Sequence, residues 1–261
     1  MKLAVTGASG SLGQALVRAG VAAGHDVTAL VRSRKAKFPS RVTVREADIV
    51  SGLALRDAFA GCDAIVDGFN VRSTQGLVQG TRNILEAAGD VDVKHFVGIS
   101  IIGCDKVGIP YHRSKVKQEE VIERTTMPWS LVRATPFFDL LDKMFSFSVL
   151  GMHFVPRDML TQPVSVDEVA TYLVAIAADR PMGRAPDFAG PEIMTMNEAF
   201  ETWCHARGVR AGVIPIPLPG KMGRAARDGA LTNPERAVGK ETFSHWLGRL
   251  RQPTTRPVHA T

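Results

Sequence analysis

The chain has 261 residues, of which 45% are hydrophobic and 22% are charged, and this composition can bury a full core. We expect one compact unit with a small appended lobe. The net charge at pH 7 is +6, but the basic residues are spread without a recognisable nucleic-acid module, so we expect no nucleic-acid partner. No run of about 18 apolar residues and no secretion signal is found, which predicts a cytoplasmic protein with no membrane partner.

The cysteines and histidines give no sign of a disulfide framework or a metal site. Cys62, Cys104 and Cys204 are odd in number and widely spaced, without a C-x-x-C pair. The histidines lack the H-x-x-x-H spacing of zinc sites. We therefore expect reduced thiols and no bound metal.

Short β-branched runs alternate with segments of helical periodicity through the first half of the chain. The expected strands are Lys2–Thr6, Asp26–Arg32, Val42–Arg45, Ala64–Asp67, His95–Ser100 and Trp129–Arg133. The expected helices are a segment with Leu12, Leu16 and Ala19 at helical spacing before Gly24, and then Leu53–Phe59, Leu77–Ala88 and Tyr111–Thr125. This alternation predicts an α/β fold with a Rossmann-type, doubly wound parallel sheet.

The character of the sequence changes after Arg133. Phenylalanine and methionine crowd residues 137–154, and three prolines from Pro215 to Pro219 mark an irregular stretch. We expect the Rossmann core to occupy residues 1–180, with 137–160 as a lid segment on the substrate side. Residues 181–261 are expected to form a small C-terminal substrate lobe and tail.

A glycine-rich turn, T-G-A-S-G-S-L-G at residues 6–13, joins the first strand to the first helix. In a dinucleotide-binding turn, Gly7 permits the tight reversal, Gly10 lets the backbone approach the pyrophosphate, and Gly13 lets the helix pack closely on the sheet. The helix N-terminus offers free N–H groups and a positive dipole to the phosphates. A purely structural turn is the alternative, but the strand before it and the helix after it favour a cofactor site at Gly7, Ser9, Gly10, Ser11, Leu12 and Gly13.

The residues after the second strand indicate which dinucleotide binds. NAD-binding proteins place an acidic residue there for the ribose 2′-hydroxyl, and this chain has none. Arg32 and Arg34 stand there instead, and guanidinium groups fork onto a 2′-phosphate. The alternative is a solvated basic loop, but we favour NADP(H). Asp48, after the third strand, reaches the adenine edge or is a surface aspartate.

The pattern resembles the atypical branch of the short-chain dehydrogenase/reductase superfamily that contains NmrA-like proteins and quinone reductases. The carriers are the glycine-rich turn, Val31-Arg32, Ala47-Asp48-Ile49, H-F-V-G-I-S at 95–100, Y-H-R-S-K at 111–115, and later stretches near 133–138, 162–170 and 189–191. The resemblance implies an NADP(H)-dependent oxidoreductase. It places further cofactor contacts at Ile49, Phe69, Asn70, Ser100, Lys115, Pro136 and Phe137.

Tyr111 and Lys115 stand four residues apart on an expected helix and so share one face. An adjacent ammonium lowers the pKa of a phenol toward a workable acid or base. The resemblance implies that Tyr111 protonates a substrate oxygen as hydride arrives, while Lys115 supports it and holds the nicotinamide ribose. Ser100 is the candidate for the third catalytic group, although a stricter alignment puts Ile101 there. In that case the polarising hydroxyl is missing, which favours enone or quinone reduction over carbonyl reduction.

The substrate and the function class stay open. The aromatic and methionine-rich segment after Pro136 suits a flat apolar or aromatic substrate, or else it is a core helix or the contact of a homodimer. We favour reduction of an apolar carbonyl, enone or quinone. One alternative is a non-enzymatic NADP(H) sensor of NmrA-like type. Another is a sugar-nucleotide epimerase or dehydratase, which needs a basic lobe from Arg207, Arg210, Lys221, Arg224 and Arg227.

Overall fold

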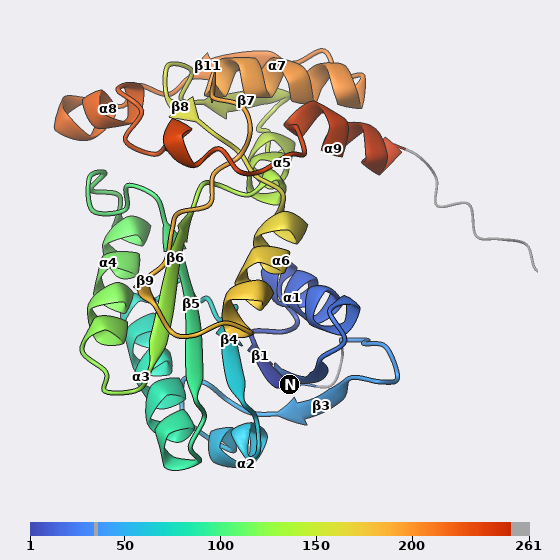
Figure 1. Cartoon of the computed structure of the whole chain (residues 1–261). Helices are drawn as coiled ribbons and strands as arrows, with labels where there is room; N and C mark the ends of the chain where they lie inside the picture. Colours follow the sequence, from blue (N-terminus) through green and yellow to red (C-terminus); the bar gives the residue numbers. More distant parts are fainter. Residues whose placement is uncertain (34–35, 252–261) are drawn as a thin grey trace, which may run out of the picture.

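The computed structural model describes residues 1–33 and 36–251, and within them seven strands form one parallel sheet. The strand order is β3–β2–β1–β4–β5–β6–β9 (Figure 1). The strands are β1 (Lys2–Thr6), β2 (Asp26–Val31), β3 (Thr43–Glu46), β4 (Ala64–Asp67), β5 (His95–Ile101), β6 (Trp129–Ala134) and β9 (Gly183–Arg184). The order reverses between β1 and β4, and ligands of such sheets bind in the crevice at that point. The predicted Rossmann-type fold is confirmed.

Helices cover both faces of this sheet. On one face lie α1 (Ser11–Ala22) and α6 (Val166–Ala177), and on the other lie α2 (Leu55–Phe59), α3 (Thr74–Asp90) and α4 (Pro110–Glu123) (Figure 1). The central strands are therefore buried on both sides, which explains why β1 and β4 are almost continuously apolar in sequence.

The helix boundaries follow local chemistry. The Ser73 side chain accepts a hydrogen bond from the Gly76 N–H and caps α3, while Pro110 occupies the first turn of α4, where its missing N–H costs nothing. The helix expected from Leu53 starts only at Leu55. Ala54 there has a φ of 62°, a left-handed conformation outside any α-helix.

A lobe at the C-terminal edge of the sheet contains the rest of the chain (Figure 1). Its elements are α5 (Phe138–Ser146), β7 (Met152–Val155), β8 (Leu160–Thr161), β10 (Met194–Thr195), α7 (Met196–Arg207), β11 (Gly212–Pro215), α8 (Gly220–Arg227), a 3₁₀ turn (Pro234–Arg236) and α9 (Phe243–Arg251). Strand β7 pairs with β11, and β8 pairs with β10.

Helix α5 packs into the core of the lobe. Phe138 and Phe145 of α5 lie in one buried cluster with Phe200, Trp203 and Phe243. The division of the chain at residue 180 and the lid role of residues 137–160 stay predictions. Strand β9, after residue 180, in turn joins the main sheet. The chain therefore enters the lobe at α5, returns to the main sheet with α6 and β9, and enters the lobe again at β10. No helix of the described part is long and apolar enough to cross a membrane.

Candidate active site

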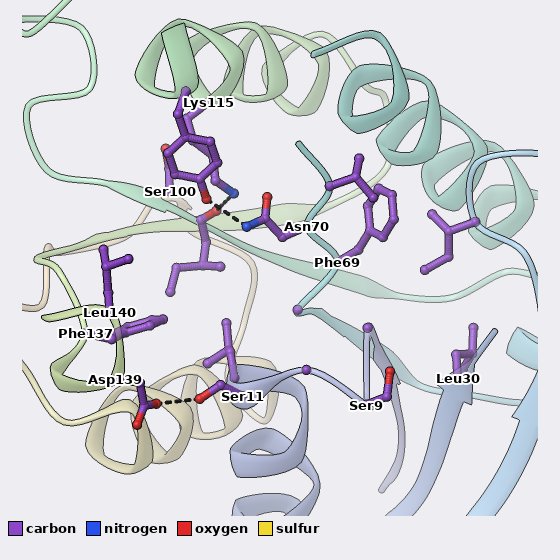
Figure 2. Close-up of a pocket in the computed structure, with 18 of the residues that line it drawn as sticks. Ser9, Ser11, Leu30, Phe69, Asn70, Ser100, Lys115, Phe137, Asp139 and Leu140 are labelled. Carbon is purple, nitrogen blue, oxygen red and sulfur yellow. Dashed lines mark hydrogen bonds between the residues drawn. The ribbon is translucent and has the colours of Figure 1, made fainter. Parts of the chain in front are cut away.

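A cavity of about 1060 Å³ lies along the C-terminal ends of β1, β2, β4, β5 and β6. The sequence-predicted residues that line it are Gly7, Ser9, Gly10, Ser11, Leu12, Arg32, Asp48, Ile49, Phe69, Asn70, Ser100, Tyr111, Lys115, Pro136 and Phe137. Gly13 does not line the cavity but packs against Gly7 and Ala8 of the turn, and Arg34 falls outside the described residues. The fold therefore brings residues from seven separate stretches of the chain to one opening (Figure 2).

The glycine turn has the geometry that its sequence predicts. Gly7 adopts a φ of +58°, and a Cβ atom there would lie 2.5 Å from the Gly68 carbonyl oxygen. A Cβ atom on Gly13 would lie 2.1 Å from the Gly7 carbonyl oxygen, so only glycine lets α1 pack this closely against the turn. The N-terminus of α1 opens beside Ser11 in the cavity, so its free backbone N–H groups lie where the sequence predicts phosphate binding.

The part of the cavity near Phe69 and Asp48, where the sequence predicts the adenine, is shaped by packing. Phe69 lies against Gly80, where a Cβ atom would come within 2.4 Å of the Phe69 ring. The exposed Arg32 lines the same part. The Asp48 carboxylate accepts hydrogen bonds from the backbone N–H groups of Val50 (2.9 Å) and Ser51 (3.2 Å). Asp48 therefore holds its own loop in shape at the cavity wall.

Tyr111 has a different partner from the one expected. Its hydroxyl accepts a hydrogen bond of 2.8 Å from the Asn70 side-chain amide. Burial raises the pKa of the Tyr111 phenol, and the bond from Asn70 opposes that rise. The expected lowering by Lys115 is wrong for this structure, since the ammonium is held elsewhere. A phenol with a raised pKa is protonated at neutral pH and so holds a proton that it can donate, although the raised pKa makes it a weaker acid than a free phenol.

Lys115 is buried and forms part of the cavity wall. Its Nζ donates to the Gln118 Oε1 atom (2.8 Å) and to the Ile99 carbonyl oxygen (3.2 Å). Burial lowers the pKa of the ammonium, while the charge of Asp67 opposes the change. Neither Asp67 nor Gln118 was predicted as a site residue from the sequence. The one available signal was Asp67 itself, a charged residue at the end of the otherwise apolar strand β4.

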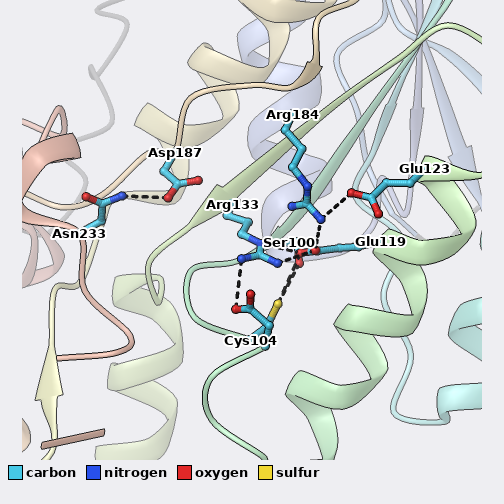
Figure 3. Close-up of polar contacts among 9 residues, drawn as sticks. Ser100, Cys104, Glu119, Glu123, Arg133, Arg184, Asp187 and Asn233 are labelled. Atoms are coloured by element: carbon cyan, nitrogen blue, oxygen red, sulfur yellow. Dashed lines mark hydrogen bonds and ion pairs between the residues drawn. The ribbon is translucent and has the colours of Figure 1, made fainter. Parts of the chain in front are cut away.

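Ser100 lines the cavity, but its hydroxyl faces the other side of β5. It lies 3.8 Å from the Cys104 sulfur, beside the Glu119 carboxylate (Figure 3). Arg133 forks onto Glu119 through Nε (2.9 Å) and Nη2 (2.6 Å). The catalytic role of Ser100 stays a prediction that these contacts do not support. Its orientation agrees with the alignment that puts Ile101 at the serine position, because Ile99 and Ile101 line the cavity as well.

Helix α5 supplies lining residues that sequence reasoning missed. Asp139, Leu140 and Lys143 face the cavity from it, and the Ser11 hydroxyl donates a hydrogen bond of 2.5 Å to the Asp139 carboxylate (Figure 2). This contact joins the cofactor turn to the lobe. No sequence signal linked these residues, because 128 positions separate them.

The five basic residues considered for an epimerase, Arg207, Arg210, Lys221, Arg224 and Arg227, lie away from the cavity. Arg207 pairs with Asp142, and Arg227 donates to the Leu218 carbonyl oxygen. Within residues 1–33 and 36–251, no three His, Cys, Asp or Glu side chains are grouped to hold a metal ion.

Comparison with known families identifies the first two thirds of the chain. A model described as NAD(P)H-binding matches residues 7–180. The chain belongs to this NAD(P)H-binding family. The match spans the glycine turn, Tyr111 and Lys115, and it confirms the predicted nucleotide-binding class without deciding between NAD(H) and NADP(H).

Relatives of this NAD(P)H-binding protein have different functions. The photosystem II assembly factor Ycf39 of Synechocystis sp. is 24% identical over 84% of this chain and 71% of its own length. The NADPH-dependent quinone oxidoreductase QOR2 of Escherichia coli, solved with NADPH, has a TM-score of 0.76 and 16% identity over 95% of this chain and 99% of that one. A nucleoside-diphosphate-sugar epimerase of Staphylococcus aureus has a TM-score of 0.75 and 19% identity over 95% and 100%. The two solved structures show that the chain shares their α/β fold over nearly its whole length.

Proposed function

We propose that this protein is an NADPH-dependent reductase of an apolar carbonyl, enone or quinone. The observation that carries the proposal is the position of the Tyr111 hydroxyl, which lines the same cavity as the glycine turn and the N-terminus of α1. Apolar side chains, Val71, Phe137 and Leu140, line the cavity as well and suit a flat apolar substrate.

The residues divide the work of the reaction. NADPH, when bound, supplies hydride to the substrate carbon. Tyr111 donates its hydroxyl proton to the substrate oxygen, and the Asn70 amide then stabilises the phenolate through the bond it already makes. Lys115 holds the nicotinamide ribose from the wall of the cavity, and the α1 N-terminus binds the pyrophosphate. Charge on Arg32 selects the 2′-phosphate and so favours NADPH over NADH.

The test measures NADPH and NADH oxidation against a panel of quinones, enones and aromatic ketones. Tyr111→Phe should lower kcat/KM by about 100-fold with little change in NADPH affinity, because only the proton donor is lost. Tyr172→Phe is a matched control, since the Tyr172 hydroxyl bonds the Pro186 carbonyl oxygen outside the cavity. Equal losses in both variants would contradict the role of Tyr111, and a preference for NADH would contradict that of Arg32.

A second candidate is a nucleotide-binding protein that acts on a protein partner without turnover. Two observations favour this second candidate. The Ser100 hydroxyl faces Cys104 and not the cavity, and the chain is similar to the assembly factor Ycf39. NADPH binding in the absence of any reduction across the panel would support this candidate. The search would then move to partners captured only with nucleotide bound. A cytoplasmic location and a homodimer stay predictions under both candidates.

A further inference from the structure

The Lys115 ammonium is held by the protein in one orientation. It has three N–H donors, and among the described residues two acceptors use two of them, the Gln118 Oε1 atom and the Ile99 carbonyl oxygen. Lys115 lines the cavity, so the third donor is free for a ligand hydroxyl there. The direction of that third N–H depends on where the two acceptors stand.

Gln118 presents its oxygen to Lys115 because its nitrogen is bound on the other side. The Nε2 atom donates to the Thr81 hydroxyl oxygen (3.1 Å) and approaches the Asp67 Oδ2 atom (3.5 Å). Gln118, Thr81 and Asp67 are each at most 2% exposed. The Thr81 hydroxyl donates its own proton to the Leu77 carbonyl oxygen (3.0 Å), so it can only accept from the amide, and the Asp67 Oδ2 atom lies on the same side. These two oxygens fix which end of the amide faces the ammonium.

Asp67 is itself fixed by the cofactor turn. Its Oδ1 atom accepts hydrogen bonds from the Thr6 hydroxyl, directly before Gly7, and from the Phe69 backbone N–H (3.1 Å). One buried polar chain therefore runs from the start of the glycine turn through Asp67 and Gln118 to Lys115. Buried polar groups that are fully bonded in this way hold a single geometry.

We propose that Gln118 is a positioning residue, which fixes the Lys115 ammonium toward the nicotinamide ribose and is itself oriented by Asp67. This inference rests on the proposed function, in which Lys115 holds that ribose. Gln118 does not line the cavity and touches the ligand only through Lys115.

The test is a double-mutant cycle read by the Kd for NADPH, which needs no turnover. Gln118→Met keeps the side-chain length and removes both polar ends, and it should weaken NADPH binding about tenfold, the effect of one misplaced charged hydrogen bond. In a Lys115→Ala background the same change should have no further effect. Gln75→Met, at an exposed position of α3, is the matched control and should bind normally.

Two results would overturn the inference. One is a tenfold loss that persists in the Lys115→Ala background, because Gln118 would then act on the fold and not through Lys115. The other is normal affinity in Gln118→Met. If Gln118→Met does not fold, Thr81→Val, which removes the second partner of the amide nitrogen, should give a smaller loss that also vanishes with Lys115→Ala. Failure of the proposed reductase function would appear separately. The wild type would then show no turnover, while the Kd values for NADPH of the Gln118 and Lys115 variants would still follow the expected cycle.

Discussion

The two ends of the cavity are built in different ways. The nucleotide end is made of consecutive residues, Gly7 to Gly13, whose backbone and missing side chains define the site. The other end, called the catalytic end because the proposed reaction takes place there, is made of side chains from the β4 loop, α4 and α5, such as Asn70, Tyr111 and Asp139. The first end depends on space for the backbone. The second depends on hydrogen bonds between distant parts of the chain, so the two ends should fail under different substitutions.

The largest effect is expected at the nucleotide end. Gly13→Ala places a Cβ atom 2.1 Å from the Gly7 carbonyl oxygen and 2.6 Å from the Ala8 Cα atom, both backbone atoms that can move only with the turn. Binding of NADPH should fall by about 100-fold or more, equivalent to about 2.7 kcal/mol. Fluorescence titration with NADPH measures this loss.

Gly89→Ala is the control for this prediction. Gly89 lies in α3 with open space around its Cα atom, and alanine is the better helix former by about 1 kcal/mol. It should raise the melting temperature and leave the Kd for NADPH unchanged. Normal NADPH affinity in Gly13→Ala would show that the close approach of α1 to the turn is unnecessary for binding.

The second prediction concerns the polar cluster behind the catalytic end, where Glu119 binds Arg133 and Arg184 (Figure 3). The Glu119 side chain is only 3% exposed, and although burial alone would raise the pKa of its carboxyl, hydrogen bonds from its partners hold it at about 2. Glu119→Gln should lower the free energy of unfolding by about 3 kcal/mol at neutral pH, because it leaves Arg133 without its main partner. Urea unfolding measures the difference.

The pH dependence has a defined sign. A carboxyl whose pKa is lower in the folded protein than its ordinary 4.5 stabilises the fold above pH 4.5 and loses that contribution as the pH falls toward 2. The stability gap between wild type and Glu119→Gln should therefore close over that window. Glu123→Gln, which removes a half-exposed partner of Arg184, should lower the stability by less than about 1 kcal/mol. A gap that does not narrow in acid would contradict the ionised state of Glu119.

The contrast between the two ends also explains what the sequence could predict. The strands and helices before residue 135 and the glycine turn depend on local periodicity and on residues that are close in sequence, and they were predicted correctly to within a few positions. Helix α6, strand β9 and the elements of the lobe were not assigned from the sequence. The hydrogen-bond partners of Tyr111 and Lys115 were not predicted. Asn70 reaches Tyr111 only because the fold brings the end of β4 against α4, and nothing in the sequence marks Gln118 as the partner of Lys115. The helix spacing of Tyr111 and Lys115 predicted a shared face, but it could not show that a buried amide draws the ammonium away from the phenol.

The smallest expected effect lies where the two ends meet, at the bond between Ser11 and Asp139. This carboxylate stands beside the N-terminus of α1, where the phosphates of the cofactor are proposed to bind. Asp139→Asn removes a negative charge from that position and keeps a hydrogen-bond acceptor for Ser11, so NADPH should bind about threefold more tightly at low salt, with the gain shrinking as ionic strength rises. Asp142→Asn, on the same helix but bonded to Trp203 and Arg207 in the lobe, should leave the affinity unchanged. Weaker binding in Asp139→Asn would instead mean that the carboxylate holds Ser11 in place for the cofactor, and the catalytic end would then support the nucleotide end through this one contact.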